Sequence, residues 1–274
     1  MKADERAFVE ALRADDVSGA TAIVARAAAF LAAGERERGV LLTLADACVE
    51  AQPAMAGLLT MRRIVREADS PAAALMRLVE QLRRAPAAIA RQAAEVLRLG
   101  LTPGLAGRPA LTVVTCSASA AVEETLRVLG ATADVTVCCA ESQPRGEGAM
   151  LARRLAVAGI AVQLFSDAGA SAAVPGSDAL IIGADAIGPD AVVNKVGSAA
   201  LCALSSVTGV PVYALAGREK LLEATEFGEL RFLEPPSDLR AEESGPSGLR
   251  LRNPIFETIP RHLISVVITD AGSI

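Results

Sequence analysis

The sequence predicts an α/β protein: a helical N-terminal domain over residues 1–105 followed by a Rossmann-like, doubly wound, mainly parallel sheet over residues 106–274. Apolar residues recur at helical spacing through roughly the first hundred residues, and short β-rich runs then alternate with helical segments. Hydrophobic residues make up 52% of the chain but aromatic residues only 3%. The core must therefore be built from small aliphatic side chains, which let helices pack closely on a parallel sheet.

The N-terminal region is rich in Ala, Leu, Arg and Glu, and residues 61–68 show its helical periodicity. A new helix is expected at Ser70-Pro71, because Ser70 can cap it and Pro71 suits the first helical position. Gly and Pro then cluster over residues 100–107, and this cluster is the best candidate for a domain boundary.

The C-terminal region contains six apolar, β-rich runs: 111–115, 134–139, 161–166, 179–183, 211–216 and 263–269. Helical segments are expected at 120–129, 148–158 and 198–208. Strands this apolar, separated by amphipathic helices, predict a parallel sheet covered on both faces. Residues 234–249, rich in Pro, Ser, Gly and acidic residues, are expected to form an exposed loop.

Charge and cysteine usage exclude several function classes. The net charge of −5 argues against a nucleic-acid partner, which needs a basic face, although a local basic pocket for a small phosphorylated ligand is compatible with it. The five Cys match no zinc spacing, so we expect free thiols and no metal site. Without a signal peptide or an apolar stretch long enough to cross a membrane, the chain is expected to be soluble and cytoplasmic.

No GxGxxG motif follows the first strand and no GxxxxGK[ST] motif occurs, so we expect no dinucleotide or other cofactor. In an open parallel sheet, ligands bind beyond the carboxyl ends of the strands. Four such positions carry unusual residues here and should meet along one edge of the sheet.

The first two positions follow the strands at 111–115 and 134–139. Residues 115–119 could hold a phosphate at a helix N-terminus, or Ser117 or Ser119 could simply cap that helix. Residues 141–148 place a carboxylate, an Arg and two Gly ahead of a helix, which suits a charged ligand and equally suits an exposed loop with a solvated Arg.

The other two positions follow the apolar run at 179–183. Asp185 could act as a base there, or could cap a neighbouring loop. Asn194 and Lys195 supply an amide and a cation, for which anion binding is favoured over a surface role because their neighbours are apolar.

The segment DALIIGADAIGPDAVVNKVGSAALCAL at 178–204 closely resembles the signature of the initiation-factor-2B α/β/δ family, which includes methylthioribose-1-phosphate isomerase and ribose-1,5-bisphosphate isomerase. Residues 17–20 look like the family's Arg-Gly-Ala loop, and residues 141–148 like its Glu-Ser-Arg-Pro…Gln-Gly loop. Segments 253–260 and 267–272 also fit, so the resemblance covers about residues 17–272. It implies the two-domain fold above and dimerisation through the C-terminal domain.

In the isomerase branch, the resemblance implies that a cysteine and the Gly-Ala-Asp aspartate flank sugar C1 and C2 and move hydrogen between them. The catalytic candidates are therefore Asp185, Ser117 at the cysteine position, and Cys116 one residue earlier. The candidate ligand-binding or phosphate-binding residues are Ser18, Gly19, Ala20, Ser119, Glu141, Gln143, Arg145, Gly148, Asn194 and Lys195.

Three positions depart from the family pattern. Ser117 replaces the cysteine, and Ser18 and Gln143 replace an arginine in each of the two loops, although Arg145 follows closely. Each lost arginine removes a charge-assisted contact worth ~1.5–3 kcal/mol.

Three hypotheses follow: a sugar-phosphate isomerase, a non-catalytic regulatory or assembly subunit that senses a phosphorylated sugar or nucleotide, and a purely structural subunit. The first two share a phosphorylated, ribose-type ligand. All are expected to form a homodimer or a higher homo-oligomer.

Overall fold

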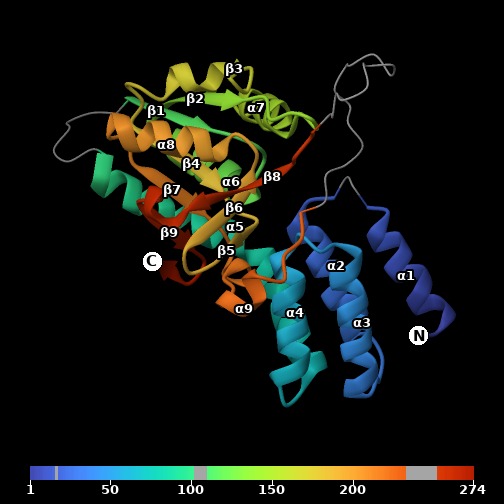
Figure 1. Ribbon diagram of the computed structural model, residues 1–274. Coiled ribbons are helices and arrows are strands. Elements are labelled where there is room, and N and C mark those ends of the chain that lie inside the picture. Colours follow the sequence, from blue (N-terminus) through green and yellow to red (C-terminus); the bar gives the residue numbers. More distant parts are fainter. Residues whose placement is uncertain (16–17, 102–109, 233–251) are drawn as a thin grey trace, which may run out of the picture.

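The computed structural model describes residues 1–15, 18–101, 110–232 and 252–274 (Figure 1). The N-terminal region is helical, as predicted. Its helices are α1 (Ala3–Arg13), α2 (Ala20–Ala32), α3 (Arg38–Ala51), α4 (Ala56–Glu67) and α5 (Pro71–Leu101). The first four stand side by side next to the sheet-containing part of the molecule (Figure 1). Their shared core consists of small and aliphatic side chains, including Ile23, Ala27, Leu44 and Leu58.

Helix α5 begins at Pro71, where the sequence predicts a helix start, and continues for 31 residues. Its first half packs Leu75, Leu78 and Leu82 into the helical core, whereas its second half packs Ile89 and Leu97 against the sheet. One continuous helix thus joins the two parts of the molecule. The predicted boundary cluster at 100–107 lies mostly outside the described residues, and the expected loop at 234–249 lies entirely outside them.

The C-terminal region contains a seven-stranded sheet in the order β10-β9-β7-β4-β1-β2-β3. Its strands are β1 (Ala110–Thr115), β2 (Asp134–Ala140), β3 (Ala161–Phe165), β4 (Ala179–Gly183), β7 (Val212–Leu215), β9 (Val266–Thr269) and β10 (Gly272–Ser273). All neighbours pair in parallel except β10, which is antiparallel to β9. The predicted α/β class with a mainly parallel sheet is confirmed.

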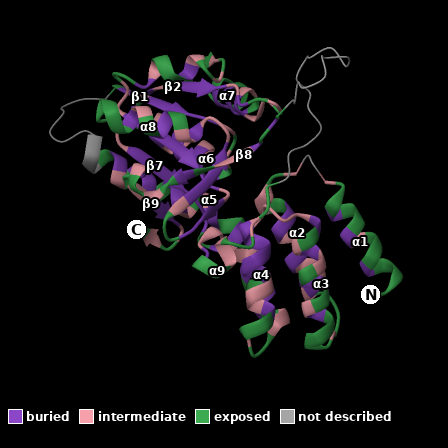
Figure 2. Cartoon of the chain, in the orientation of Figure 1, coloured by how far each residue is buried: buried purple, intermediate pink, exposed green. Residues whose placement is uncertain are grey.

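Alternate residues of each strand point to opposite sides of the sheet. Apolar side chains therefore lie on both faces, and helices pack on each of them. Val113 and Ile181 face a core formed with α5, α6 (Ala120–Gly130) and α7 (Glu147–Val157). Val114 and Ile182 face the core that includes α8 (Ser198–Thr208) and the 3-10 turn η1 (Gly169–Ala173). The central strands β4 and β7 are buried along their whole length, and Figure 2 shows the middle of the sheet in the colour of buried residues.

A second, three-stranded sheet in the order β5-β6-β8 was not predicted. It pairs β5 (Ala186–Ile187), β6 (Ala191–Lys195) and β8 (Phe256–Pro260) in antiparallel fashion. Asn194 and Lys195 are therefore the last two residues of β6 and not part of a loop that follows β4. The remaining elements are the turns η2 (Arg218–Lys220) and η3 (Arg261–Leu263) and the short helix α9 (Ala224–Phe227). Within the described ranges, no helix combines the length and apolar character needed to cross a bilayer.

The strand order places a topological switch point between β1 and β4. From β1 the chain proceeds to β2 and β3 on one side, and from β4 it proceeds to β7 and β9 on the other. Ligands of doubly wound sheets bind outside the carboxyl ends of the strands at such a point. The residues following Thr115 and Gly183 occupy this position.

A substitution at Gly148 can test how closely α7 packs against β2. A Cβ at residue 148 would lie 1.8 Å from the Ala140 carbonyl oxygen, so Gly148→Ala should lower the free energy of unfolding by about 3 kcal/mol or more, at the upper end of overpacking costs. Gly39→Ala is the matched control, because residue 39 is helical and a Cβ there meets no atom within 4 Å. It should be neutral or stabilising by up to about 1 kcal/mol in urea unfolding. Equal stabilities of the two variants would contradict this packing.

Candidate functional site

Four segments converge at the switch point, and we call them the strand-end cluster: residues 115–119, 141–148, 183–185 and 193–198. The Ser142 hydroxyl oxygen accepts a hydrogen bond from the Ser117 backbone N–H at 2.7 Å, which joins the first two. A Cβ on Gly183 would lie 2.8 Å from that of Ser119. The backbone N–H of Asp185 donates to the Val193 carbonyl at 2.8 Å, which joins the last two. The segments singled out in the sequence therefore lie together.

Cys116 is tied into a buried hydrogen-bond network. Its Sγ lies 3.2 Å from Ser198 Oγ, and that hydroxyl donates to the Lys195 carbonyl at 2.6 Å while accepting from Asn194 Nδ2 at 2.9 Å. The Ser198 hydroxyl already donates its only proton to the Lys195 carbonyl. The Cys116 thiol must therefore be protonated and donate to the Ser198 oxygen. Burial raises the pKa of Cys116 to about 11. This thiol is poorly suited to proton transfer near neutral pH.

Ser117, by contrast, is only partly buried and adopts a left-handed backbone conformation with φ of 63°. Ser142 has the same unusual conformation, with φ of 65°. Such geometry in residues other than glycine costs about 1–3 kcal/mol and persists only where the surroundings hold it. Asp167 supplies part of that support by accepting hydrogen bonds from the N–H groups of Ser142 at 2.6 Å and Gln143 at 2.8 Å.

The Asp185 carboxylate accepts no hydrogen bond from any residue in the described part of the chain, although its backbone is fixed. Burial raises the pKa of Asp185 above its ordinary value, the positive charges of Lys220 and Lys195 oppose this shift, and Glu147 adds to it. A carboxyl group with a raised pKa and an open oxygen can accept and return a proton closer to neutral pH. A perturbed pKa together with an unbonded carboxylate is typical of groups at functional sites.

Lys195 is almost fully buried and forms an ion pair with Glu147. Its Nζ donates to the two carboxylate oxygens at 3.0 and 2.9 Å, and the two side chains are 2% and 22% exposed. The Glu147 carboxylate therefore neutralises the positive charge of Lys195, which is predicted from the sequence to bind an anion. An anionic ligand must either share Lys195 with this carboxylate or displace it.

Lys220 was not predicted. It lies in η2 after the carboxyl end of β7, and its Nζ donates to the Ala184 carbonyl at 2.6 Å, one residue before Asp185. The signal was present in the sequence, because the Gly217–Lys220 segment follows an apolar strand just as the Asp185 segment does. Only the pairing of β7 with β4 shows that the two strand ends are neighbours.

Other predicted residues lie at the margin of the cluster or away from it. Gln143 and Arg145 are exposed, and Gln143 Nε2 donates to Glu141 Oε2 at 3.3 Å. Ser18, Gly19 and Ala20 form the entry to α2, where the Ser18 N–H donates to Asp15 Oδ1 at 2.8 Å. Their predicted ligand contacts stay predictions. Among the described residues, no group of three or more His, Cys, Asp or Glu could hold a metal ion.

Comparison with known proteins identifies the family. Residues 21–274 match the model of the initiation factor 2 subunit family. The chain belongs to this family. Among its relatives, a ribose 1,5-bisphosphate isomerase of Archaeoglobus fulgidus is 33% identical over 60% of this chain and 53% of the relative. A methylthioribose-1-phosphate isomerase of Desulforudis audaxviator is 35% identical over 50% of this chain and 42% of the relative. The chain thus spans about half the length of the curated relatives that it matches.

Solved structures of initiation factor 2 family members share the fold. The Pyrococcus horikoshii OT3 translation initiation factor eIF-2B superposes with a TM-score of 0.78 at 22% identity, covering 100% of this chain and 98% of that one. A chain of the tetrameric eIF2B-beta2-delta2 complex from C. thermophilum superposes with a TM-score of 0.71 at 19% identity, covering 99% and 90%.

The Lys195–Glu147 pair can be tested by Glu147→Gln, which keeps a hydrogen-bond acceptor but removes the negative charge. Inorganic phosphate should bind at least about tenfold more tightly, a change of ~1.4 kcal/mol, because Lys195 is no longer neutralised. Calorimetric titration at fixed ionic strength measures this. Glu67→Gln, at the exposed last residue of α4, is the control for net charge and should bind like the wild type. Unchanged phosphate affinity in Glu147→Gln would show that anions do not use Lys195.

Proposed function

We propose that the protein binds a phosphorylated ribose-type sugar at the strand-end cluster and isomerises its 1-phosphate aldose form to the ketose. The observation that carries this proposal is the Asp185 carboxyl group at the switch point, with an open oxygen, a raised pKa and two lysines close enough to oppose that shift. The names of the matched relatives, two classes of sugar-phosphate isomerase, support the same reaction type.

An aldose-to-ketose isomerisation moves one hydrogen from C2 to C1 and leaves the composition of the sugar unchanged. Opening of the sugar ring breaks the bond between C1 and the ring oxygen, and that oxygen gains the proton that the 2-hydroxyl loses. Asp185 takes the 2-hydroxyl proton and returns it to the ring oxygen, so no co-reactant is consumed. The raised pKa of Asp185 suits both halves of this exchange.

Ser117 is the better candidate than Cys116 for the second position beside the sugar. The Cys116 thiol donates within its own buried network, whereas Ser117 is partly exposed and held in a strained conformation. A serine hydroxyl is too weak an acid for proton transfer near neutral pH, so Ser117 orients a sugar hydroxyl by hydrogen bonding. Asp185 then carries the proton exchange alone, and a modest turnover is expected.

Positive charge and backbone N–H groups supply the phosphate contacts. Lys220 and Lys195 flank the Asp185 segment, and the amino end of α6 has no side-chain cap, which leaves its first N–H groups available to an anion. The amino end of α8 is less suitable, because Glu257 already accepts from the Ala199 N–H at 2.7 Å.

The alternative is a non-catalytic regulatory or assembly subunit that senses a phosphorylated sugar or nucleotide. Two observations favour this alternative because they weaken the proposed chemistry: Glu147 neutralises Lys195, and the buried Cys116 thiol has a raised pKa.

In either case we propose a homodimer or a higher homo-oligomer in the cytoplasm. The tetramer of beta and delta subunits named for one solved relative supports oligomerisation in this fold, and five free cysteines support a reducing compartment.

Turnover is tested by incubating the protein with ribose 1,5-bisphosphate or ribose 1-phosphate and following the ketose carbonyl by NMR. Asp185→Asn should abolish ketose formation while leaving substrate binding within about tenfold, since the amide keeps the shape but cannot take the proton. The exposed Asp69→Asn is the matched control and should be fully active. Substrate binding by the wild type without any ketose would instead support the non-catalytic alternative.

Asp185→Asn should also raise the melting temperature at neutral pH, because burying this carboxylate opposes folding. The sign follows from its raised pKa: the folded state holds this proton more tightly, so the wild type loses stability as the pH rises from about 3.8, the ordinary value, through the raised pKa. The stability gap between variant and wild type should therefore widen over that window and then stay constant. A variant less stable than the wild type at neutral pH would contradict the buried-charge assignment.

A further inference from the structure

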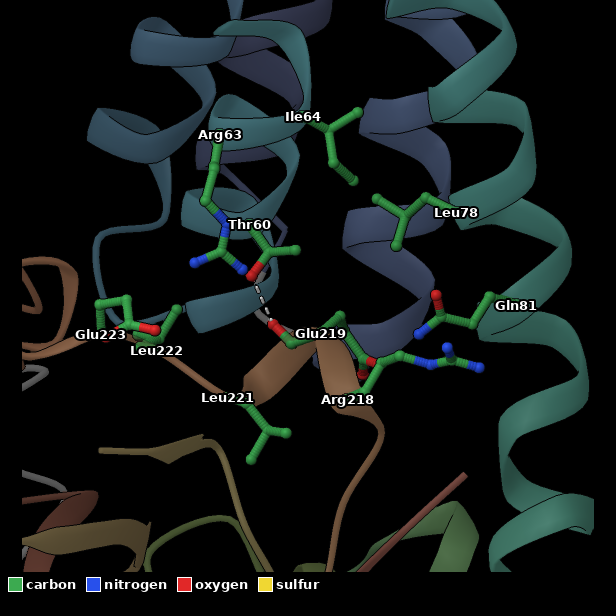
Figure 3. A pocket seen from close by; sticks show the side chains of 10 residues that line it. All are labelled: Thr60, Arg63, Ile64, Leu78, Gln81, Arg218, Glu219, Leu221, Leu222 and Glu223. Atoms are coloured by element: carbon green, nitrogen blue, oxygen red, sulfur yellow. Dashed lines mark hydrogen bonds between the residues drawn. The ribbon is translucent and has the colours of Figure 1, made fainter. Parts of the chain in front are cut away.

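A cavity of about 560 Å³ lies outside the strand-end cluster, between α4, α5 and the η2 segment (Figure 3). Its walls carry Ile64, Leu78 and Leu221 as apolar contacts and Arg63, Gln81, Arg218 and Glu219 as polar ones. This volume falls in the range of pockets that hold small organic ligands, and such pockets combine apolar walls with a few convergent polar groups.

Two polar atoms on these walls are buried and have no hydrogen-bond partner among the described residues: Gln81 Nε2 and Glu219 Oε2. Glu219 is only 4% exposed, and burial raises the pKa of its carboxyl group. Figure 3 shows its carboxylate and the Gln81 amide on the same side of the cavity. Buried polar atoms are nearly always satisfied in folded proteins, and each unsatisfied one costs about 1–3 kcal/mol. A donor and an acceptor left open on one wall indicate a missing partner that both accepts and donates.

The two arginines of the cavity are already paired with acids. Arg63 contacts Glu226, and Arg218 Nε donates to Asp270 Oδ2 at 2.8 Å. Neither arginine is therefore an uncompensated cation that would select a free phosphate. The Glu219 carboxylate is buried with one oxygen unbonded, and the positive charges of Lys220 and Arg218 only partly oppose the burial that raises its pKa, so it calls for a further positively charged donor. Gln81 Nε2 beside it calls for an acceptor, and the Arg218 guanidinium next to Gln81 in Figure 3 can contribute to the same acceptor.

We propose that this cavity is a binding site for a small zwitterion of the α-amino-acid type. The ligand ammonium bonds the Glu219 carboxylate, its carboxylate accepts from Gln81 and Arg218, and a short aliphatic side chain packs against Ile64, Leu78 and Leu221. Amino acids place an ammonium and a carboxylate on one carbon, which matches a donor and an acceptor left open on the same wall. The two charges of the ligand also leave the cavity's charge balance unchanged.

The test uses L-leucine as the probe on the full chain, with saturation-transfer NMR and calorimetry to measure binding. N-acetyl-leucine lacks the ammonium and leucinamide lacks the carboxylate, so each should bind at least about tenfold more weakly, a loss of ~1.4 kcal/mol. Inorganic phosphate should compete only weakly with leucine, because Asp270 already partners Arg218 and the Glu219 carboxylate repels an anion that brings no ammonium.

Two variants remove one contact each. Glu219→Gln and Gln81→Leu should weaken leucine binding at least about tenfold. The hydrogen bond from Thr60 to the Glu219 backbone carbonyl does not depend on either side chain, and far-UV circular dichroism checks that both variants fold. No leucine binding at millimolar concentration, equal binding of leucine and its two analogues, or undiminished binding in both folded variants would overturn the proposal. If leucine binds but ribose phosphates are not turned over, the cavity proposal stands and only the proposed isomerase activity fails.

Discussion

The ion pair of Lys195 and Glu147 joins the two sheets of the C-terminal region. Lys195 ends β6 in the small antiparallel sheet, and Glu147 begins α7, which packs on the large parallel one. Two charges in a largely buried position hold each other in place, because removing one partner leaves the other desolvated and uncompensated, typically at a cost of about 3–5 kcal/mol. Asn194 precedes Lys195 on the same strand and the Asp185 segment pairs with that strand, so the ion pair lies next to both.

The same pair governs the electrostatics of the strand-end cluster. Lys195 and Lys220 act on Asp185 together with Glu147, so the cluster is much closer to neutral than its two lysines suggest. Under the proposed function, a nearly neutral cluster is expected to distinguish sugars by their hydroxyl groups more strongly than by the number of their phosphates. The departure at Gln143 acts in the same direction, because it puts a neutral side chain in the cluster where the family pattern has an arginine.

Much of this fold was accessible from the sequence because its signals are local. The apolar runs that became β1, β2 and β4, and the Ser70-Pro71 start of α5, depend on a few neighbouring residues. The second sheet was not accessible, because β5 has only two residues and β6 pairs with β8 more than sixty residues away. The partnership of Lys195 with Glu147 and the approach of Lys220 to Asp185 likewise depend on tertiary pairing. The choice between Cys116 and Ser117 depends on a backbone angle that no residue pattern encodes.

The three residues of η2 reach three different parts of the molecule. Arg218 bonds Asp270 after β9, the Glu219 carbonyl accepts from Thr60 on α4 at 2.8 Å, and Lys220 holds the Ala184 carbonyl beside Asp185. This turn therefore connects the helical bundle with the strand-end cluster through direct hydrogen bonds. A tilt of the bundle that strains the Thr60 contact also displaces the Lys220 ammonium. A ligand that shifts this turn from one end therefore changes the affinity for a ligand at the other end, and the factor is the same in both directions.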